Sequence, residues 1–269
     1  MECRHVLHEG PALLGDPVAL AMLVHGGGVA LGVGEVAQEG GESRRVAAVG
    51  SSQAARSLVI ELHAYEPAGH AQVVACGVVG AVRLLASECE RIGIRRPLVV
   101  TDAGVKAAGV LQKALDALGD LPVTVFDQTP PNPTEASVRA AHEVWRASGC
   151  DGLIAVGGGS SIDLAKGLAI MATHPGPLTT YATIEGGSPK ITPQAAPLIA
   201  VPTTAGTGSE VARGAIVIVD DGRKLGFHSW NLMPKAAILD PELTLGLPPL
   251  LTAATGMDAI AHCMETFMS

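Results

Sequence analysis

The chain has 269 residues, of which 48% are hydrophobic and 16% are charged. This composition predicts a folded protein with room for two domains, and it excludes an intrinsically disordered chain. The formal net charge is -8, so no basic surface is expected that would bind nucleic acid or an anionic membrane.

The cysteines and the apolar runs bear on the compartment. Five cysteines are scattered along the chain without a CxxC pair. An odd, unpaired set argues against a disulfide framework and for a reducing compartment. No early apolar run approaches the ~20 residues that a membrane-spanning helix needs. We therefore expect a cytoplasmic protein with no secretory signal and no membrane partner.

The chain changes character near residue 73. Residues 1–72 are rich in glycine, alanine and valine, and their apolar residues follow neither the helical nor the strand period. We predict an atypical extension there. From residue 73 onward, helical spacing and short apolar runs alternate regularly. Helices are predicted at 78–93, 104–119, 135–149 and 161–173, and strands at 96–102, 122–127 and 151–161, with Thr134 as a helix cap.

This alternation predicts an α/β domain whose parallel sheet carries helices on both faces. Later runs predict strands at 197–202, 215–221 and 236–243, with 224–229 returning as the hairpin partner of the second. Pro248 and Pro249 then begin a helical pattern that continues to the last residue. We place a domain boundary after residue 247, which separates an α/β domain at 73–247 from a helical segment at 248–269.

The stretch "AVGGGSSIDLAK" (155–166) is the strongest indication of a phosphate site. A predicted strand delivers Gly157, Gly158 and Gly159 onto the start of a helix. Glycines allow a phosphate close to the backbone, and the helix N-terminus presents unpaired N–H groups and a positive dipole end. Ser160 and Asp163 have the S-x-x-D spacing of a helix cap. The alternative is a tight strand-to-helix turn without a ligand.

Two further features follow strands of the same predicted sheet. Asp102 ends the first clear strand, where a carboxylate can accept hydrogen bonds from a ribose; the alternative is an ordinary turn residue. The stretch "PTTAGTGSE" (202–210) places Thr203, Thr204 and Thr207 around two glycines. Their hydroxyl groups suit a polar ligand, and the alternative is a flexible loop.

Asp258 and His262 are four residues apart in the C-terminal helical pattern, so both side chains lie on one face. A carboxylate with an imidazole suits Fe²⁺ or Zn²⁺. The alternative is a simple hydrogen bond or ion pair on the helix surface.

These stretches, in this order, resemble the iron-containing (group III) alcohol dehydrogenase family. The resemblance rests on "VVTDAG", "PNPT", "AVGGGSSIDLAK", "VPTTAGTGSEV", "ILDPELTLGLPP" and "AATGMDAIAHCME". It covers about residues 75–269 and does not extend to 1–72.

The resemblance implies a dinucleotide-binding domain followed by an all-helical domain, with NAD(H) in the cleft and a divalent metal, Fe²⁺ or Zn²⁺, that holds the substrate oxygen. It implies reversible hydride transfer between NAD(H) and a primary alcohol or aldehyde, with the metal as Lewis acid. Family members often form dimers, so a second copy of the chain is an expected partner.

The resemblance also implies roles for individual residues. Asp102 corresponds to the residue that reads the adenosine ribose and favours NAD over NADP. Asp258 and His262 match the first two metal ligands. The remaining cofactor contacts implied are Gly158, Gly159 and Ser160 in the pyrophosphate loop, Thr203, Thr204 and Thr207 in the second loop, and Lys224 and Leu243.

One departure from the family pattern bears on activity. The family takes two further histidine ligands from downstream helices, and the sequence ends seven residues after His262. We therefore expect the nucleotide-binding half of a longer enzyme, with exposed apolar surface and a tendency to aggregate. A non-catalytic nucleotide-binding fragment or pseudo-enzyme is one alternative. A glycerol dehydrogenase-like or dehydroquinate synthase-like enzyme is another.

Overall fold

The computed structural model describes residues 69–268 together with short stretches before them, at 13–14, 23–25, 28–30, 36–37 and 59–66. Most of the predicted extension therefore lies outside the described residues. The described parts of it include four short strands, which are β1 (Leu13–Leu14), β2 (Leu23–His25), β3 (Gly28–Ala30) and β4 (Val36–Ala37). They pair as β1 with β4 and β2 with β3.

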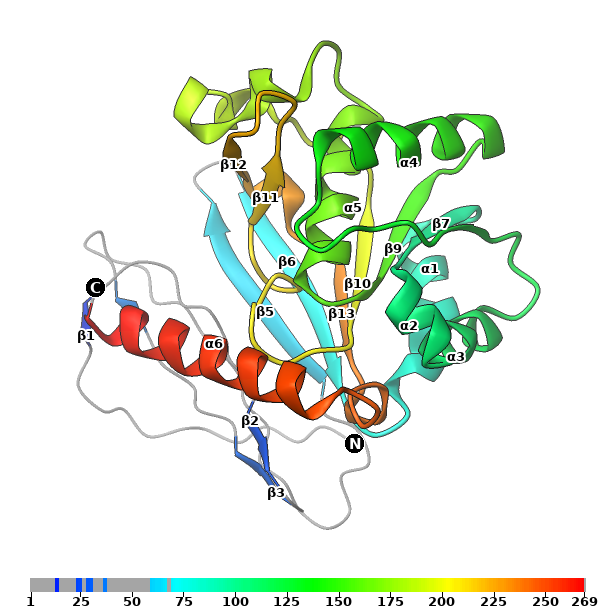
Figure 1. The fold of residues 1–269 in the computed structure, drawn as a ribbon, viewed down its shortest axis with the longest axis vertical. Helices are drawn as coiled ribbons and strands as arrows, with labels where there is room; N and C mark the ends of the chain where they lie inside the picture. The colour runs from blue at the N-terminus through cyan, green and yellow to red at the C-terminus, as the bar shows by residue number, and fades with distance from the viewer. Residues whose placement is uncertain are drawn as a thin grey trace.

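A seven-stranded sheet forms the centre of the described chain (Figure 1), with the strand order β5-β6-β13-β10-β9-β7-β8. Six strands are parallel, and β5 is an antiparallel edge strand. The sheet begins at Val59, inside the stretch assigned from sequence to the extension. The strands are β5 (Val59–Glu66), β6 (Gly69–Gly77), β7 (Pro97–Val100), β8 (Thr124–Phe126), β9 (Gly152–Gly157), β10 (Leu198–Pro202) and β13 (Ala236–Leu239).

Helices cover both faces of the sheet, as predicted. Neighbouring strand residues point to opposite faces, so Leu153 and Ala155 join one buried cluster, and Ile154 and Val156 join the other. The first cluster includes side chains of α4 and α5, and the second includes those of α1 and α3. The helices are α1 (Leu85–Ile92), α2 (Ala103–Ala107), α3 (Val110–Leu118), α4 (Glu135–Ser148) and α5 (Gly159–Met171).

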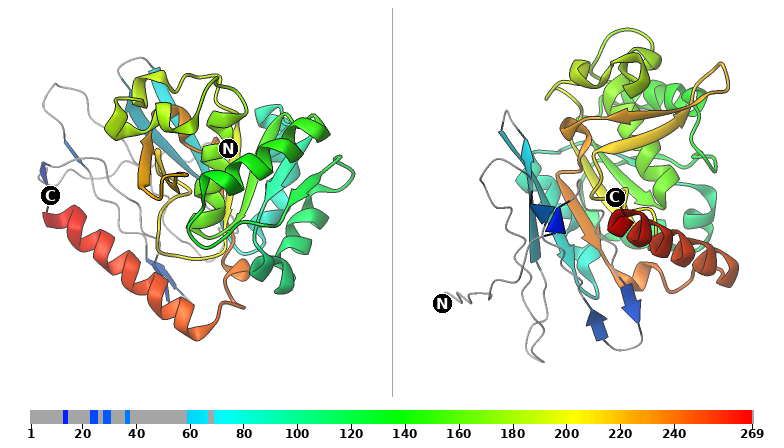
Figure 2. Two further views of the ribbon diagram at one scale, coloured as in Figure 1. Left: turned by 45° about the horizontal axis from the view of Figure 1, so that its top comes forward. Right: turned by 90° about the vertical axis from the view of Figure 1, so that its left-hand side faces the viewer.

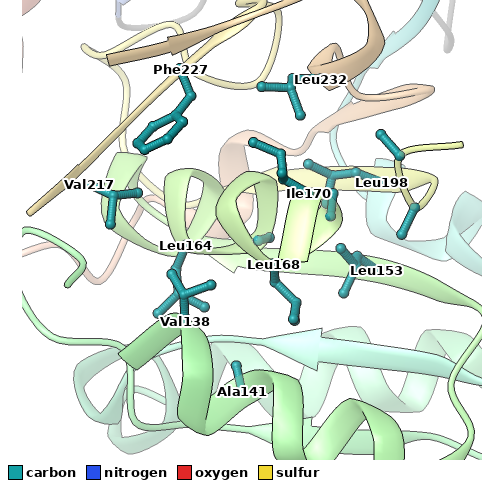
Figure 3. Close-up of a cluster of buried hydrophobic side chains, with 14 of the residues drawn as sticks. Val138, Ala141, Leu153, Leu164, Leu168, Ile170, Leu198, Val217, Phe227 and Leu232 are labelled. Carbon is teal, nitrogen blue, oxygen red and sulfur yellow. The ribbon is translucent and has the colours of Figure 1, made fainter. Parts of the chain in front are cut away.

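α5 is enclosed on several sides. Figure 3 shows its Leu164 and Leu168 beside Val138 of α4, with Val217 and Phe227 of a separate hairpin on another side. A helix that is apolar nearly all round its circumference belongs in an interior position. Two of its side chains are nevertheless charged, Asp163 and Lys166.

The hairpin is formed by β11 (Gly214–Ile218) and β12 (Lys224–His228), which pair antiparallel as predicted. The predicted single helix 104–119 is wrong in one respect, because it divides into α2 and α3. Gly109 lies between them at φ 73°, a left-handed conformation that ends the first helix. The 3-10 helices are η1 (Ala81–Leu84), η2 (Leu178–Tyr181), η3 (Thr183–Glu185), η4 (Ser188–Lys190), η5 (Trp230–Leu232) and η6 (Pro241–Leu243).

The last element is the long helix α6 (Pro249–Met268). Figures 1 and 2 show it as a separate rod next to the loop that follows β10, outside the layers of the α/β unit. Large apolar side chains along it are exposed, including Leu250 at 84% and Met257 at 62%. Within the described residues, no helix is both long and apolar enough to cross a membrane.

Candidate functional site

Gly157, Gly158 and Gly159 form the turn between β9 and α5, here called the glycine turn. It lies at the point where the strand order of the sheet reverses. From β7 the chain moves outward to β8, returns to β9 on the other side of β7, and continues to β10. Open parallel sheets bind ligands outside the carboxyl ends of the strands at such a reversal. Asp102 follows β7 and Gly157 ends β9, so the two predicted features lie on neighbouring strands there.

The N-terminus of α5 has no side-chain cap. Its cap residue is Gly158, with no side-chain hydrogen bond. The predicted cap at Ser160 is therefore wrong, because Ser160 is already inside the helix and its Oγ accepts a hydrogen bond from the Asn132 N–H at 3.3 Å. The first N–H groups of a helix have no intrahelical acceptor. The Ser161 N–H donates to the Gly158 carbonyl at 3.1 Å, so the N–H groups of Gly159 and Ser160 are the ones that face an anion at the positive end of the helix dipole.

Residues 203–208, which follow β10 and are here called the threonine loop, face the glycine turn at close range. The Thr203 N–H donates to the Gly157 carbonyl at 3.1 Å, which joins the two strand ends. A Cβ added at Gly158 would lie 3.1 Å from Thr204 Oγ1, and one at Gly159 would lie 2.8 Å from Thr207 Cγ2. The two loops therefore lie in close contact, and a side chain at Gly159 would force Thr207 to shift.

Asp102 both caps a helix and borders the glycine turn. Its Oδ1 accepts hydrogen bonds from the Gly104 and Val105 N–H groups at 2.8 and 3.0 Å, at the start of α2. Its Oδ2 lies 3.4 Å from the place where a Cβ on Gly157 would be. One carboxylate oxygen thus serves the fold, and the other faces the candidate site.

Asn132 links two of the predicted contacts and was not identified from the sequence. Lys224 Nζ donates to Asn132 Oδ1 at 3.0 Å, and the Asn132 N–H donates to Ser160. Asn132 has φ 56°, a left-handed conformation that asparagine tolerates better than most residues. The available signal was the asparagine within "PNPT", one of the stretches on which the family resemblance rests.

Leu243 does not join this group through its side chain. The side chain is 3% exposed and belongs to the cluster beneath α1 and α3. Any contact with a ligand would have to come from its backbone.

The two predicted metal ligands lie on one face of α6. Asp258 Oδ2 is 3.9 Å from His262 Nδ1, and both side chains are partly exposed. His262 Nδ1 is also 3.3 Å from the Gly206 carbonyl of the threonine loop. A carbonyl can only accept, so this bond places the proton on Nδ1 and leaves the Nε2 lone pair for a ligand.

These two residues are an incomplete set of metal ligands. Among the residues that the structure describes, no group of three or more His, Cys, Asp or Glu side chains could hold a metal ion. Zinc and iron sites take three or four protein ligands. The described donors alone therefore do not fit a closed metal site.

Known proteins share the sequence and the fold of this chain. The family model for iron-containing alcohol dehydrogenases matches residues 73–241. A 4-hydroxybutyrate dehydrogenase of Cupriavidus necator is 76% identical over 190 residues, which are 71% of this chain and 50% of that protein. A 1,3-propanediol dehydrogenase of Citrobacter freundii is 43% identical over 195 residues, 70% of this chain and 49% of that protein.

Solved structures agree with this result. A 1,3-propanediol oxidoreductase superposes with a TM-score of 0.65 at 39% identity, covering 69% of this chain and 48% of that one. A sulfoacetaldehyde reductase from Bifidobacterium kashiwanohense, in complex with NAD+, gives 0.63 at 35% identity, covering 69% and 49%. The chain spans about half the length of the relatives it matches.

Proposed function

The chain belongs to the iron-containing alcohol dehydrogenase family, and on that premise we propose that it forms the nucleotide-binding part of an NAD(H)-dependent oxidoreductase acting on primary alcohols and aldehydes. The observation that carries the proposal is the close approach of the glycine turn and the threonine loop at the reversal of the strand order. Open helix amides and threonine hydroxyls converge there, as a pyrophosphate requires.

The remaining contacts extend this site in two directions. Asp102 reads the adenosine ribose with the oxygen that faces Gly157, and its negative charge disfavours the 2′-phosphate of NADP. Lys224, held through Asn132 beside Ser160, adds positive charge near the phosphates. When bound, NAD(H) supplies or accepts the hydride.

The substrate that we propose is 4-hydroxybutyrate, oxidised at its primary alcohol. Support comes from the 76% identity with the dehydrogenase named for that compound. The notable alternative is a nucleotide-binding protein without turnover. It is favoured by the finding that Asp258 and His262 gather no third ligand among the described residues.

In the first test, the purified chain is titrated with NADH and binding is monitored by fluorescence. We expect saturable binding that Gly159→Ala weakens about tenfold or more, because the new Cβ would lie 2.8 Å from Thr207. The matched control is Gly246→Ala, where a Cβ would meet nothing within 4 Å. Absence of NADH binding by the unaltered chain would refute the nucleotide site.

Turnover is tested separately. The chain is reloaded anaerobically with Fe²⁺ or Zn²⁺, desalted and analysed for metal. It is then assayed with NAD+ and 4-hydroxybutyrate, 1,3-propanediol or glycerol. Retained metal with 4-hydroxybutyrate oxidation supports the dehydrogenase. NADH binding without retained metal or turnover supports the non-catalytic alternative, and preference for glycerol supports a glycerol dehydrogenase-like enzyme.

A further inference from the structure

A lysine in the interior of α5 makes contacts that the nucleotide site does not use directly. Lys166 is fully buried, with 0% of its surface exposed. Its Nζ donates to the carbonyls of Ser209, Ala212 and Gly214 at 2.7, 2.7 and 2.8 Å. A lysine ammonium has three N–H donors, so all three are used on one stretch of backbone.

That stretch is the continuation of the threonine loop. Residues 209–214 connect Thr207, which faces Gly159, to the start of β11. Asp163, one helical turn before Lys166, accepts a hydrogen bond at 3.0 Å from the N–H of Ile216, which lies in β11 directly after this segment. α5 therefore carries the glycine turn at its N-terminus and holds the opposing loop through side chains one and two turns further on.

The charges around the ammonium fit this arrangement. Burial lowers the pKa of Lys166 to about 8, against the attraction of Asp163 and Glu210. The amine thus remains mostly protonated at pH 7. Burial also raises the pKa of Asp163, with Lys166 opposing the shift. A neutral amine would offer two donors to three carbonyls, so the charged form is the one that the loop accommodates.

We propose that Lys166 is a positioning residue for the nucleotide, because its ammonium holds the backbone of residues 209–214 and thereby keeps Thr204 and Thr207 opposite the glycine turn. The inference rests on the proposed NAD(H) site. It assigns no contact between Lys166 and the nucleotide itself.

The experiment compares Lys166→Met and Lys166→Gln with the unaltered chain. Lys166→Met keeps an unbranched side chain as long as the lysine stem without its ammonium group, and it leaves three carbonyls without a donor. We expect its Kd for NADH to rise tenfold or more, and the Kd of Lys166→Gln, which retains an amide donor, to rise less. Hydrogen exchange should accelerate at residues 204–216 and stay unchanged in β7 and β9.

A destabilised control separates positioning from general stability. Leu118→Ala removes a buried side chain from α3 on the opposite face of the sheet. It should lower the Tm and leave the Kd for NADH unchanged. An unchanged Kd in folded Lys166→Met would overturn the inference while the nucleotide site stands. Failure of the unaltered chain to bind NADH would instead remove the proposed function.

If both Lys166 variants fail to fold, hydrogen exchange of the unaltered chain tests the inference instead. We expect saturating NADH to slow hydrogen exchange at 204–216 as well as at the glycine turn. Protection of the glycine turn alone would overturn the positioning role of Lys166, because the loop it holds would then not take part in binding.

Discussion

At the scale of single residues, two buried titratable groups show how differently burial acts. Lys166 keeps its charge because three carbonyls and two carboxylates surround it. Cys89 of α1 is equally buried, in an apolar cluster, and burial together with Glu88 and Asp151 raises its pKa from 9.0 to about 11. A thiol needs no partner to remain neutral, so burial in an apolar cluster leaves Cys89 inert.

Cys89 should therefore resist alkylation. At pH 8 we expect iodoacetamide to label the exposed Cys263 and spare Cys89, as mapped by peptide mass spectrometry. Its folded pKa is raised, so its contribution to stability is present below pH 9 and is lost as the pH rises toward 11. Labelling in 6 M guanidinium should reach both thiols. Equal rates in the folded chain would show that Cys89 is not shielded.

At the scale of elements, the helices differ in how they begin. α4 has a capping box, in which Thr134 Oγ1 accepts from the Ser137 N–H at 3.1 Å and Ser137 Oγ accepts from the Thr134 N–H at 3.0 Å. α5 begins at Gly158 without any side-chain cap. The first arrangement uses the terminal amides for stability, and the second leaves them for a ligand.

The cap on α4 yields a stability prediction. Thr134→Ala should lower the free energy of unfolding by about 1 kcal/mol, because an unpaired amide replaces the cap. Thr134→Ser keeps the hydroxyl and should cost less. Denaturant unfolding followed by circular dichroism measures both. A loss as large for Thr134→Ser as for Thr134→Ala would contradict the role of the hydroxyl.

At the scale of the whole molecule, α6 stands apart from the two buried clusters. It meets the threonine loop at Gly206, where an added Cβ would lie 2.6 Å from the Thr255 carbonyl. Along its exposed side lie Met257 at 62%, Ile260 at 47% and Met264 at 57%. Exposed apolar side chains gathered on one element favour association.

We expect the chain to self-associate through this face. Sedimentation velocity should show a coefficient that rises with concentration, and replacing Met257, Ile260 and Met264 with lysine should abolish the rise. The matched control adds three lysines at the exposed alanines 136, 140 and 147 of α4 and should associate like the unaltered chain. Equal association in both variants would place the contact elsewhere, as in a dimer through another surface.

Most helices and strands after residue 77 could be predicted from the sequence, because apolar periodicity and glycine or threonine at helix ends act over a few residues. The strands β5 and β6 were missed, because they lie largely in the stretch assigned to the extension. Strand-helix alternation indicated the parallel sheet with helices on both faces, Thr134 indicated the cap of α4, and Asp258 with His262 indicated one shared face of α6. Two predictions from local sequence patterns were wrong. Gly109 divides the predicted helix 104–119, and Ser160 does not cap α5.

The contacts that assemble the site were decided only by the tertiary structure. Which strands are neighbours follows from the packing of helices on both faces, and that packing places Asp102 beside Gly157 and Thr207 against Gly159. Lys166 looks in sequence like any helical lysine, and its three carbonyl partners lie 43 to 48 residues away along the chain. Local patterns determine which elements form, because their energetics are local. The assignment of partners to buried polar groups depends on where the whole chain brings its distant segments together.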